Sequence, residues 1–67
     1  EAGAVNINTA GKEELMSLSG IGEAKAENII TYRETQGAFE KTEDIMNVNG
    51  IGENLFQKIK NDICVGR

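Results

Sequence analysis

Apolar residues recur at helical spacing in four short stretches of this chain. In the longest stretch, Ala26, Ile29 and Ile30 share one helix face, and Arg33, one turn further on, can cover its edge with an aliphatic stem. No stretch alternates between apolar and polar residues as a half-buried strand would, and no proline interrupts the pattern. The pattern therefore predicts an all-α fold of four to five short helices.

Residues that start and end helices flank these stretches. Asn8 or Thr9 can cap the first helix and Thr42 the third, because their side-chain oxygens accept hydrogen bonds from free backbone N–H groups. Gly37 suits the position just after the second helix. The predicted helices cover roughly residues 10–17, 23–34, 42–47 and 53–63.

The apolar positions also predict which side chains form the core. Ile7, with Leu15 and Leu18, is expected to pin the start of the chain to the core. Phe39 is placed to pack at the start of the third helix. The last helix is expected to bury Leu55, Ile59 and Ile63, whereas the residues up to Val5 read as a tail or the end of a linker.

A glycine-containing segment occurs twice, thirty residues apart. Leu18–Glu23 reads LSGIGE and Val48–Glu53 reads VNGIGE, and each copy follows an acidic-apolar stretch. Solenoid arrays need about three or more repeats to bury a continuous core. Two copies therefore predict one closed, pseudo-two-fold domain over residues 1–67, with repeat 1 at about 9–34 and repeat 2 at about 42–63.

Each glycine pair precedes a predicted helix. Glycine permits positive φ and close approach of a ligand to the backbone. The first N–H groups of the helix remain uncovered at the positive end of its dipole, which suits an anion such as phosphate. A single copy is explained equally well as a tight turn, but two copies with matched flanks favour two phosphate clamps and hence a module that binds duplex DNA.

Composition narrows the function further. The 67 residues include no His and one Cys, which excludes an internal disulfide and leaves the common catalytic and metal-binding constellations without their usual members. The net charge is −4, and the sequence pI is about 4.6, although a nucleic-acid binder is expected to carry a basic patch. Acids gather in or just before the first helix of each repeat, and most of the bases lie in the second, so the hairpin face can be less negative than the rest. The acidic composition still predicts weak DNA binding.

Three motifs resemble a known family. Leu18–Ala26 fits the helix-hairpin-helix pattern Leu-x-Gly-Ile-Gly-x-x-x-Ala, and Gly50–Gly52 supplies its second copy. The opening Asn6–Ala10 and the later Gly37–Phe39 fit one subgroup. Together they are similar to the C-terminal DNA-binding domain of the competence protein ComEA family, a tandem helix-hairpin-helix (SAM-domain-like) fold.

This resemblance implies a role outside the cytoplasm. Domains of this family bind double-stranded DNA without sequence preference and pass it to an uptake channel during transformation. The resemblance implies an extracytoplasmic protein, membrane-anchored or secreted in its full length, with DNA-uptake channel proteins as further partners. It implies no enzyme activity, no cofactor and no membrane contact by the domain itself.

The resemblance also assigns site residues. The first clamp would be the backbone of Gly20, Ile21 and Gly22, with Lys25 adding a charged contact. The second would be the backbone at residues 50–52, with two supporting donors on the following helix. Its members are Gly50, Ile51, Gly52, Asn54 and Lys58.

A monovalent cation site is a less favoured expectation of the same resemblance. Some hairpins of this kind hold such an ion on backbone carbonyls. Here the carbonyls would be those near Met16, Leu18 and Ile21.

The second repeat departs from the first at two positions that matter. Leu55 stands where the first repeat has Lys25, and Phe56 stands where it has a small alanine. Glu23 and Glu53 follow the glycines and can compete with phosphate or, as we favour, point sideways and stabilise the helix start. These departures suggest that the first hairpin does most of the binding.

Two other functions stay open at this stage. The same compact fold can act as a protein-protein interaction module that uses its acidic surface, because a fold does not fix a function. An enzyme such as a glycosylase or nuclease is disfavoured, since the length and composition supply neither a pocket nor catalytic residues.

Overall fold

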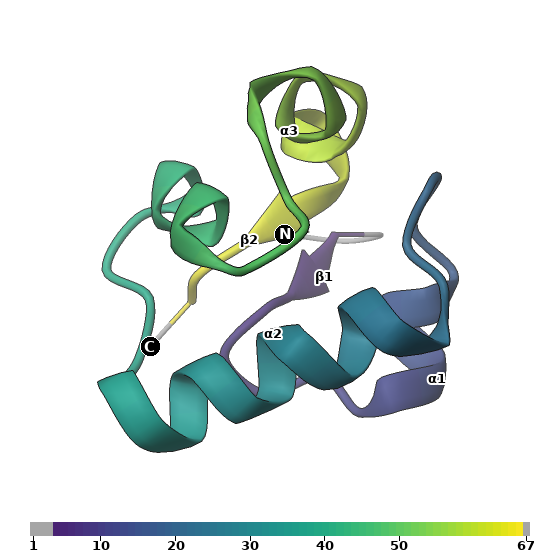
Figure 1. Ribbon diagram of the computed structural model, residues 1–67. Coiled ribbons are helices and arrows are strands. Elements are labelled where there is room, and N and C mark those ends of the chain that lie inside the picture. The colour runs from purple at the N-terminus through teal and green to yellow at the C-terminus, as the bar shows by residue number, and fades with distance from the viewer. Residues whose placement is uncertain (1–3, 67) are drawn as a thin grey trace.

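The computed structural model describes residues 4–66, which form five short helices and one pair of very short strands (Figure 1). The all-α prediction is therefore confirmed, with a small strand pair in addition. In chain order the elements are β1 (Val5–Asn6), α1 (Lys12–Met16), α2 (Glu23–Gln36), the 3₁₀ helix η1 (Thr42–Asn47), α3 (Glu53–Ile59), the 3₁₀ helix η2 (Lys60–Asp62) and β2 (Ile63–Cys64).

The two halves of the chain have the same order of elements. A short helix, a glycine hairpin and a second helix appear as α1 and α2 in the first half and as η1 and α3 in the second. In Figure 1, α1 and α2 lie at the bottom, η1 and α3 lie above them, and the strand pair runs between the halves. The repeat in the sequence is thus a repeat in space.

The strand pair joins the two ends of the chain. β1 and β2 run parallel, with Val5 opposite Ile63 and Asn6 opposite Cys64, and the N–H of Ile7 continues the ladder to the carbonyl of Cys64 at 3.0 Å. Val5 is buried, so the predicted tail does not extend to this residue; its first part, residues 1–3, lies outside the described residues. The last helix likewise ends before the predicted Ile63. Strands of two residues are too short to show an alternating pattern.

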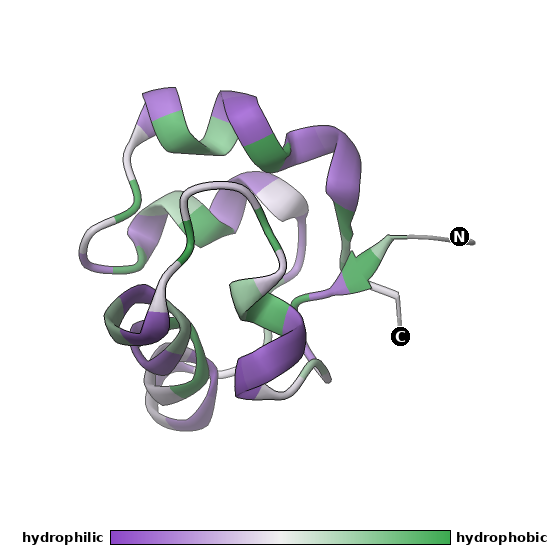
Figure 2. Ribbon diagram, turned by 90° about the vertical axis from the view of Figure 1, so that its right-hand side faces the viewer, coloured by the Kyte–Doolittle hydropathy of each residue, from purple (hydrophilic) through white to green (hydrophobic). Residues whose placement is uncertain are grey.

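One hydrophobic cluster holds the two halves together, and Figure 2 shows apolar bands on the helices interleaved with polar ones. The six largest side chains that are fully buried come from both repeats and from the segments between them. They are Phe39, Ile7, Leu15, Ile29, Ile45 and Ile59. Phe56 also lies in the core, as does Ile63, whereas Leu55 is only partly buried and packs against the cluster. Phe56, which stands where the first repeat has the smaller Ala26, therefore fills core volume.

Other predicted helix ends also need correction. The first helix, expected over residues 10–17, is shorter at both ends and covers only Lys12–Met16. α2 runs to Gln36, two residues further than expected, and ends at Gly37 with φ of 98°, as predicted for a glycine after a helix. The third helix is 3₁₀ and Thr42 is its first helical residue, so Thr42 is not the cap. The carboxylate of Asp44 instead accepts N–H groups of Glu40 and Lys41 at 3.1 and 3.4 Å.

Asn8 has a different role from the predicted helix cap. Its amide donates to the carbonyl of Phe39 at 3.0 Å and its side-chain oxygen accepts the N–H of Phe39 at 2.7 Å. The residue before α1 is Gly11, which makes no capping bond through a side chain. Arg33 donates to the carbonyl of Ile7 at 3.0 Å, which confirms a structural role for this side chain. Both contacts fasten the start of the chain to the middle.

Replacing Asn8, a half-buried loop residue, should destabilise the fold. Asn8→Ala leaves the partly buried N–H and carbonyl of Phe39 without partners, and we expect a loss of about 1–3 kcal/mol in the free energy of unfolding. Thr9→Ala, at an exposed neighbouring position, serves as the control and should change it by less than about 0.5 kcal/mol. Urea unfolding followed by circular dichroism measures both; equal losses would contradict this role of Asn8.

Candidate nucleic-acid interface

The two glycine hairpins adopt the same backbone conformation. Gly20 and Gly50 have φ of 81° and 95°, in the left-handed region that glycine adopts without strain. In each hairpin the isoleucine N–H donates to the carbonyl three residues earlier, from Ile21 to Leu18 and from Ile51 to Val48, both at 3.1 Å. The sequence repeat is therefore a repeat of turn geometry.

The isoleucine of each hairpin fixes that hairpin to the hydrophobic core. The side chains of Ile21 and Ile51 are buried in the core, with only 4% and 3% of their surface exposed. The flanking Gly20, Gly22, Gly50 and Gly52 are exposed. Each hairpin thus presents bare backbone to solvent while its one large side chain fixes it to the core.

The second helix of each repeat, α2 or α3, starts without a side-chain cap. Gly22 precedes α2 and Gly52 precedes α3 in extended conformation, and their carbonyls accept the first helical hydrogen bonds at 2.9 and 3.0 Å. Within residues 4–66, the N–H groups of residues 23–25 and 53–55 have no acceptor. Free N–H groups at a helix start are suited to bind an anion, because they add hydrogen bonds to the favourable dipole.

Each hairpin packs against the second helix of the other repeat. A Cβ placed on Gly20 would lie 2.7 Å from Cδ1 of Leu55, and a Cβ on Gly50 would lie 3.7 Å from Cγ of Lys25. Positions 25 and 55 are equivalent in the thirty-residue repeat. The packing is therefore crossed and pseudo-symmetric, and it makes the two hairpins neighbours.

This crossed packing adds a contact that the sequence does not predict for Lys25. Its stem lies against Gly50 of the second hairpin, although Lys25 follows the first hairpin in sequence. Beside it, the amide of Asn28 donates to the carbonyl of Asn49 at 3.0 Å. Asn28 and Asn49 were not predicted as site residues, although Asn28 lies one turn after Lys25 on the same face. The stem of Lys25 therefore lies against the second hairpin, and its contact with phosphate stays a prediction.

The predicted donors of the second helix are accessible. Asn54 and Lys58 are both exposed on α3. Lys58 is the repeat equivalent of Asn28, the residue that reaches across to the other hairpin. The predicted contact of Lys58 with a phosphate at the second hairpin stays a prediction.

The acid that follows the first hairpin is paired sideways. Glu23 accepts a hydrogen bond from the ammonium of Lys12 at 3.0 Å, and Glu27 accepts a second at 3.3 Å. The hydrogen bond that Lys12 donates to Glu23, followed by the one that it donates to Glu27, raises the pKa of Lys12. This arrangement agrees with the expectation that Glu23 does not occupy the N–H groups of its own helix.

The part of the chain that the structure describes contains neither a cluster of metal-binding side chains nor a helix that could cross a membrane. Residues 4–66 contain no group of three or more His, Cys, Asp or Glu side chains placed to hold a metal ion. None of their helices is long and apolar enough to cross a membrane. The predicted cation site on the carbonyls of Met16, Leu18 and Ile21 stays a prediction; the Leu18 carbonyl already accepts one N–H group, that of Ile21.

The two left-handed glycines should differ in their tolerance of alanine. Both substitutions place a side chain at positive φ and should cost about 1–3 kcal/mol in the free energy of unfolding. Gly20→Ala should cost more than Gly50→Ala, because its Cβ also overlaps Leu55 whereas the Cβ at Gly50 has ordinary van der Waals room. Urea unfolding compares them, with the exposed Ser19→Ala as control. An equal or reversed order would contradict the crossed packing.

Comparison with known proteins identifies the hairpin architecture. The family model described as "Helix-hairpin-helix motif" matches residues 1–64. ComE operon protein 1 of Bacillus subtilis is 59% identical over 61 residues, which cover 91% of this chain and 30% of that protein. This match agrees with the predicted resemblance to the competence protein ComEA family.

Proteins with other names carry a similar region. Endonuclease/exonuclease/phosphatase family domain-containing protein 1 of Homo sapiens is 48% identical over 61 residues, covering 91% of this chain and 11% of that protein. An uncharacterized protein of Haemophilus influenzae is 45% identical over 60 residues, covering 88% of this chain and 54% of that protein. The chain therefore spans a minor part of the first two relatives and about half of the third. With its model match and its paired hairpins, this chain belongs to the helix-hairpin-helix family.

Proposed function

We propose that this domain binds double-stranded DNA without sequence preference, through phosphate clamps at its two glycine hairpins. The observation that carries the proposal is the crossed packing, which brings two exposed hairpins with free helix-start N–H groups next to one another. One clamp would hold a single anion, whereas two neighbouring clamps suit the regularly spaced phosphates of a nucleic acid. Backbone N–H groups that contact phosphate fix the position of a duplex and read no sequence.

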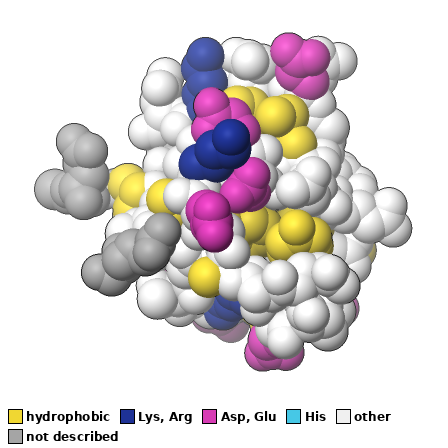
Figure 3. All heavy atoms as spheres, turned by 90° about the vertical axis from the view of Figure 1, so that its left-hand side faces the viewer, with side chains coloured by type: hydrophobic (Ala, Val, Ile, Leu, Met, Phe, Trp, Pro, Cys, Tyr) yellow, Lys and Arg dark blue, Asp and Glu magenta, His cyan; other side chains and the backbone are white. Residues whose placement is uncertain are grey.

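Charge sets the expected strength of binding. The net charge of −4 opposes DNA, and on the face shown in Figure 3 acidic and basic side chains are mixed rather than separated. The hairpins repel phosphate less than the average surface does, because the Lys25 stem lies at the second hairpin and the charge of Glu23 is paired with that of Lys12. With two to four phosphates neutralised, we expect a log–log salt slope of about −2 to −4 and a Kd near 10⁻⁴ M at physiological salt.

We further propose that the domain serves as a DNA receptor in competence. The similarity to ComE operon protein 1 supports this role, as does the family resemblance of the Asn6–Ala10 segment. The resemblance also supports an extracytoplasmic position and delivery of DNA to uptake channel proteins. The endonuclease/exonuclease/phosphatase family domain-containing protein also carries a region similar to this domain, which makes up 11% of its length. Duplex binding by the domain is therefore the more general proposal, and the role in competence is the narrower one.

A titration of labelled duplex tests the binding proposal. The fluorescence anisotropy of a random-sequence duplex and of the matching single strand is followed against domain concentration at several salt concentrations. We expect binding that prefers the duplex, is the same for unrelated sequences and weakens with salt. Absence of binding at about 20 mM salt, where screening is slight, would contradict the proposal and favour a protein partner for the acidic surface.

Removing the cation of Lys25 should lower the salt dependence of binding. Lys25→Gln keeps most of the stem that packs on Gly50 and removes one charge, so the magnitude of the log–log slope should fall by about one. Lys60→Gln makes the same charge change at an exposed position in η2, outside the proposed clamps, and is the matched control. Equal slopes for the two variants would show that Lys25 acts only through the net charge.

A further inference from the structure

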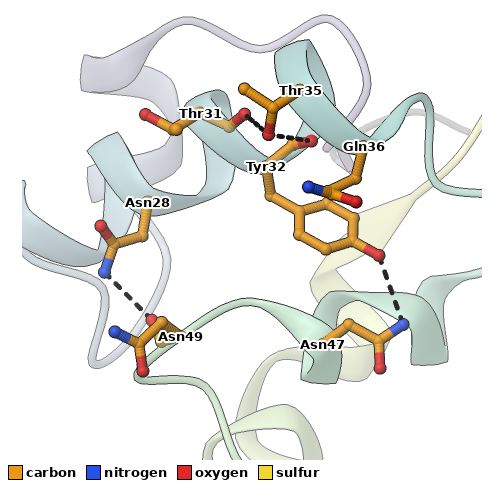
Figure 4. A pocket seen from close by; sticks show the side chains of 7 residues that line it. All are labelled: Asn28, Thr31, Tyr32, Thr35, Gln36, Asn47 and Asn49. Carbon is orange, nitrogen blue, oxygen red and sulfur yellow. Dashed lines mark hydrogen bonds between the residues drawn. The ribbon is translucent and has the colours of Figure 1, made fainter.

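A groove beside the second hairpin has no role in the clamps described above. It is open, with a volume of about 370 Å³, and lies between α2 and the segment that leads into the hairpin (Figure 4). In Figure 4, Asn28 and Asn49 close one end and Tyr32 and Asn47 face each other at the other end. The lining residues are Asn28, Thr31, Tyr32, Thr35, Gln36, Asn47 and Asn49.

The groove results from the part of the chain that is not repeated. α2 has fourteen residues and α3 has seven, so the last turns of α2 have no α-helical counterpart. Thr31, Tyr32, Thr35 and Gln36 all come from those last turns. At the equivalent place, the second repeat changes to η2 and then to β2. The first repeat therefore provides a surface that the pseudo-symmetry does not require.

The chemistry of the lining is neutral and able to form hydrogen bonds. Every lining side chain is an amide, a hydroxyl or a phenol, although the chain contains eleven acidic residues. The side-chain amides of Gln36 and Asn49 make no hydrogen bond within residues 4–66, and the one between Asn47 and the Tyr32 hydroxyl is long at 3.5 Å. These groups can donate to phosphate and sugar oxygens and place no carboxylate against them.

The position of the groove connects it with the second clamp. Asn28 and Asn49 line its end and are bonded to each other beside Gly50 and Lys25. If a phosphate is held at the second hairpin, the adjacent phosphates of the same DNA strand would therefore lie near the end of the groove that Asn28 and Asn49 line. The ring of Tyr32 is stacked on Phe39, with centroids 5.1 Å apart, which fixes the wall of the groove.

We infer that this groove holds the sugar-phosphate backbone of one DNA strand next to the phosphate bound at the second hairpin. The inference rests on the proposed function, because it extends the path of the same duplex. It assigns to Gln36, Thr31 and Asn47 neutral contacts to the backbone. The domain then contacts DNA over an unequal footprint that is longer on the side of the second hairpin.

Placing one acid in the groove tests the inference. Gln36→Glu changes only an amide to a carboxylate at an exposed position of α2. We expect the duplex affinity to fall about fivefold, the factor that corresponds to about 1 kcal/mol for like charges ~4 Å apart in water. Gln57→Glu makes the same change at an exposed position of α3 outside this groove and controls for the net charge. Its affinity should stay within about twofold of the wild type.

The outcomes separate the groove from the clamps. Equal affinities of the Gln36 and Gln57 variants for a labelled duplex, whether lowered or unchanged, would overturn the groove and leave the clamps standing if the wild type binds. Failure of the wild type to bind would overturn the proposed function itself. Thermal unfolding checks that each variant is folded, and Thr31→Glu, also exposed and in the groove, repeats the test at a second position.

Discussion

The two repeats close on one another through the crossed contact between each hairpin and the second helix of the other repeat. A helix-hairpin-helix unit of this size cannot bury its own apolar face, and the contact closes two such units around one core. Gly20 against Leu55 and Gly50 against Lys25 are the two halves of this contact. The closeness of the first pair means that a side chain at Gly20 would force the Leu55 side chain to move, whereas the second pair leaves room. The same glycines that allow the halves to close also leave the hairpin backbone exposed.

Function is proposed to follow from both the symmetric and the asymmetric features. The symmetric features are two turns with positive-φ glycines, buried isoleucines and free helix-start N–H groups, which together suit neighbouring phosphates. The asymmetric features are the lysine at one hairpin, the leucine at the other and the longer α2. They direct charge and neutral hydrogen-bonding groups to the second hairpin. The departures at positions 55 and 56 had suggested the opposite preference, for the first hairpin.

The sequence predicted the parts of the fold that are encoded locally. Glycine spacing and helical periodicity indicated the repeat, the helices and most of the core, including Ile7, Phe39 and Ile59. Contacts between distant residues were missed, because nothing at either residue signals its partner: the β1–β2 pair and the bonds of Asn8 to Phe39 are examples. The contact of the Lys25 stem with Gly50 was also missed, since the crossing of the repeats cannot be read from spacing. Asn28 shares a polar helix face with Lys25, but it belongs to no motif that would mark it as a site residue.

Backbone N–H groups of both hairpins are proposed to hold the phosphates of a duplex. The most direct test is a titration of the ¹⁵N-labelled domain with a short duplex at low salt, followed by the chemical shifts of its backbone amides. The largest shifts are expected at residues 22–25 and 52–55 together. Shifts confined to the acidic α1 and η1, or to one hairpin with the other unchanged, would contradict it.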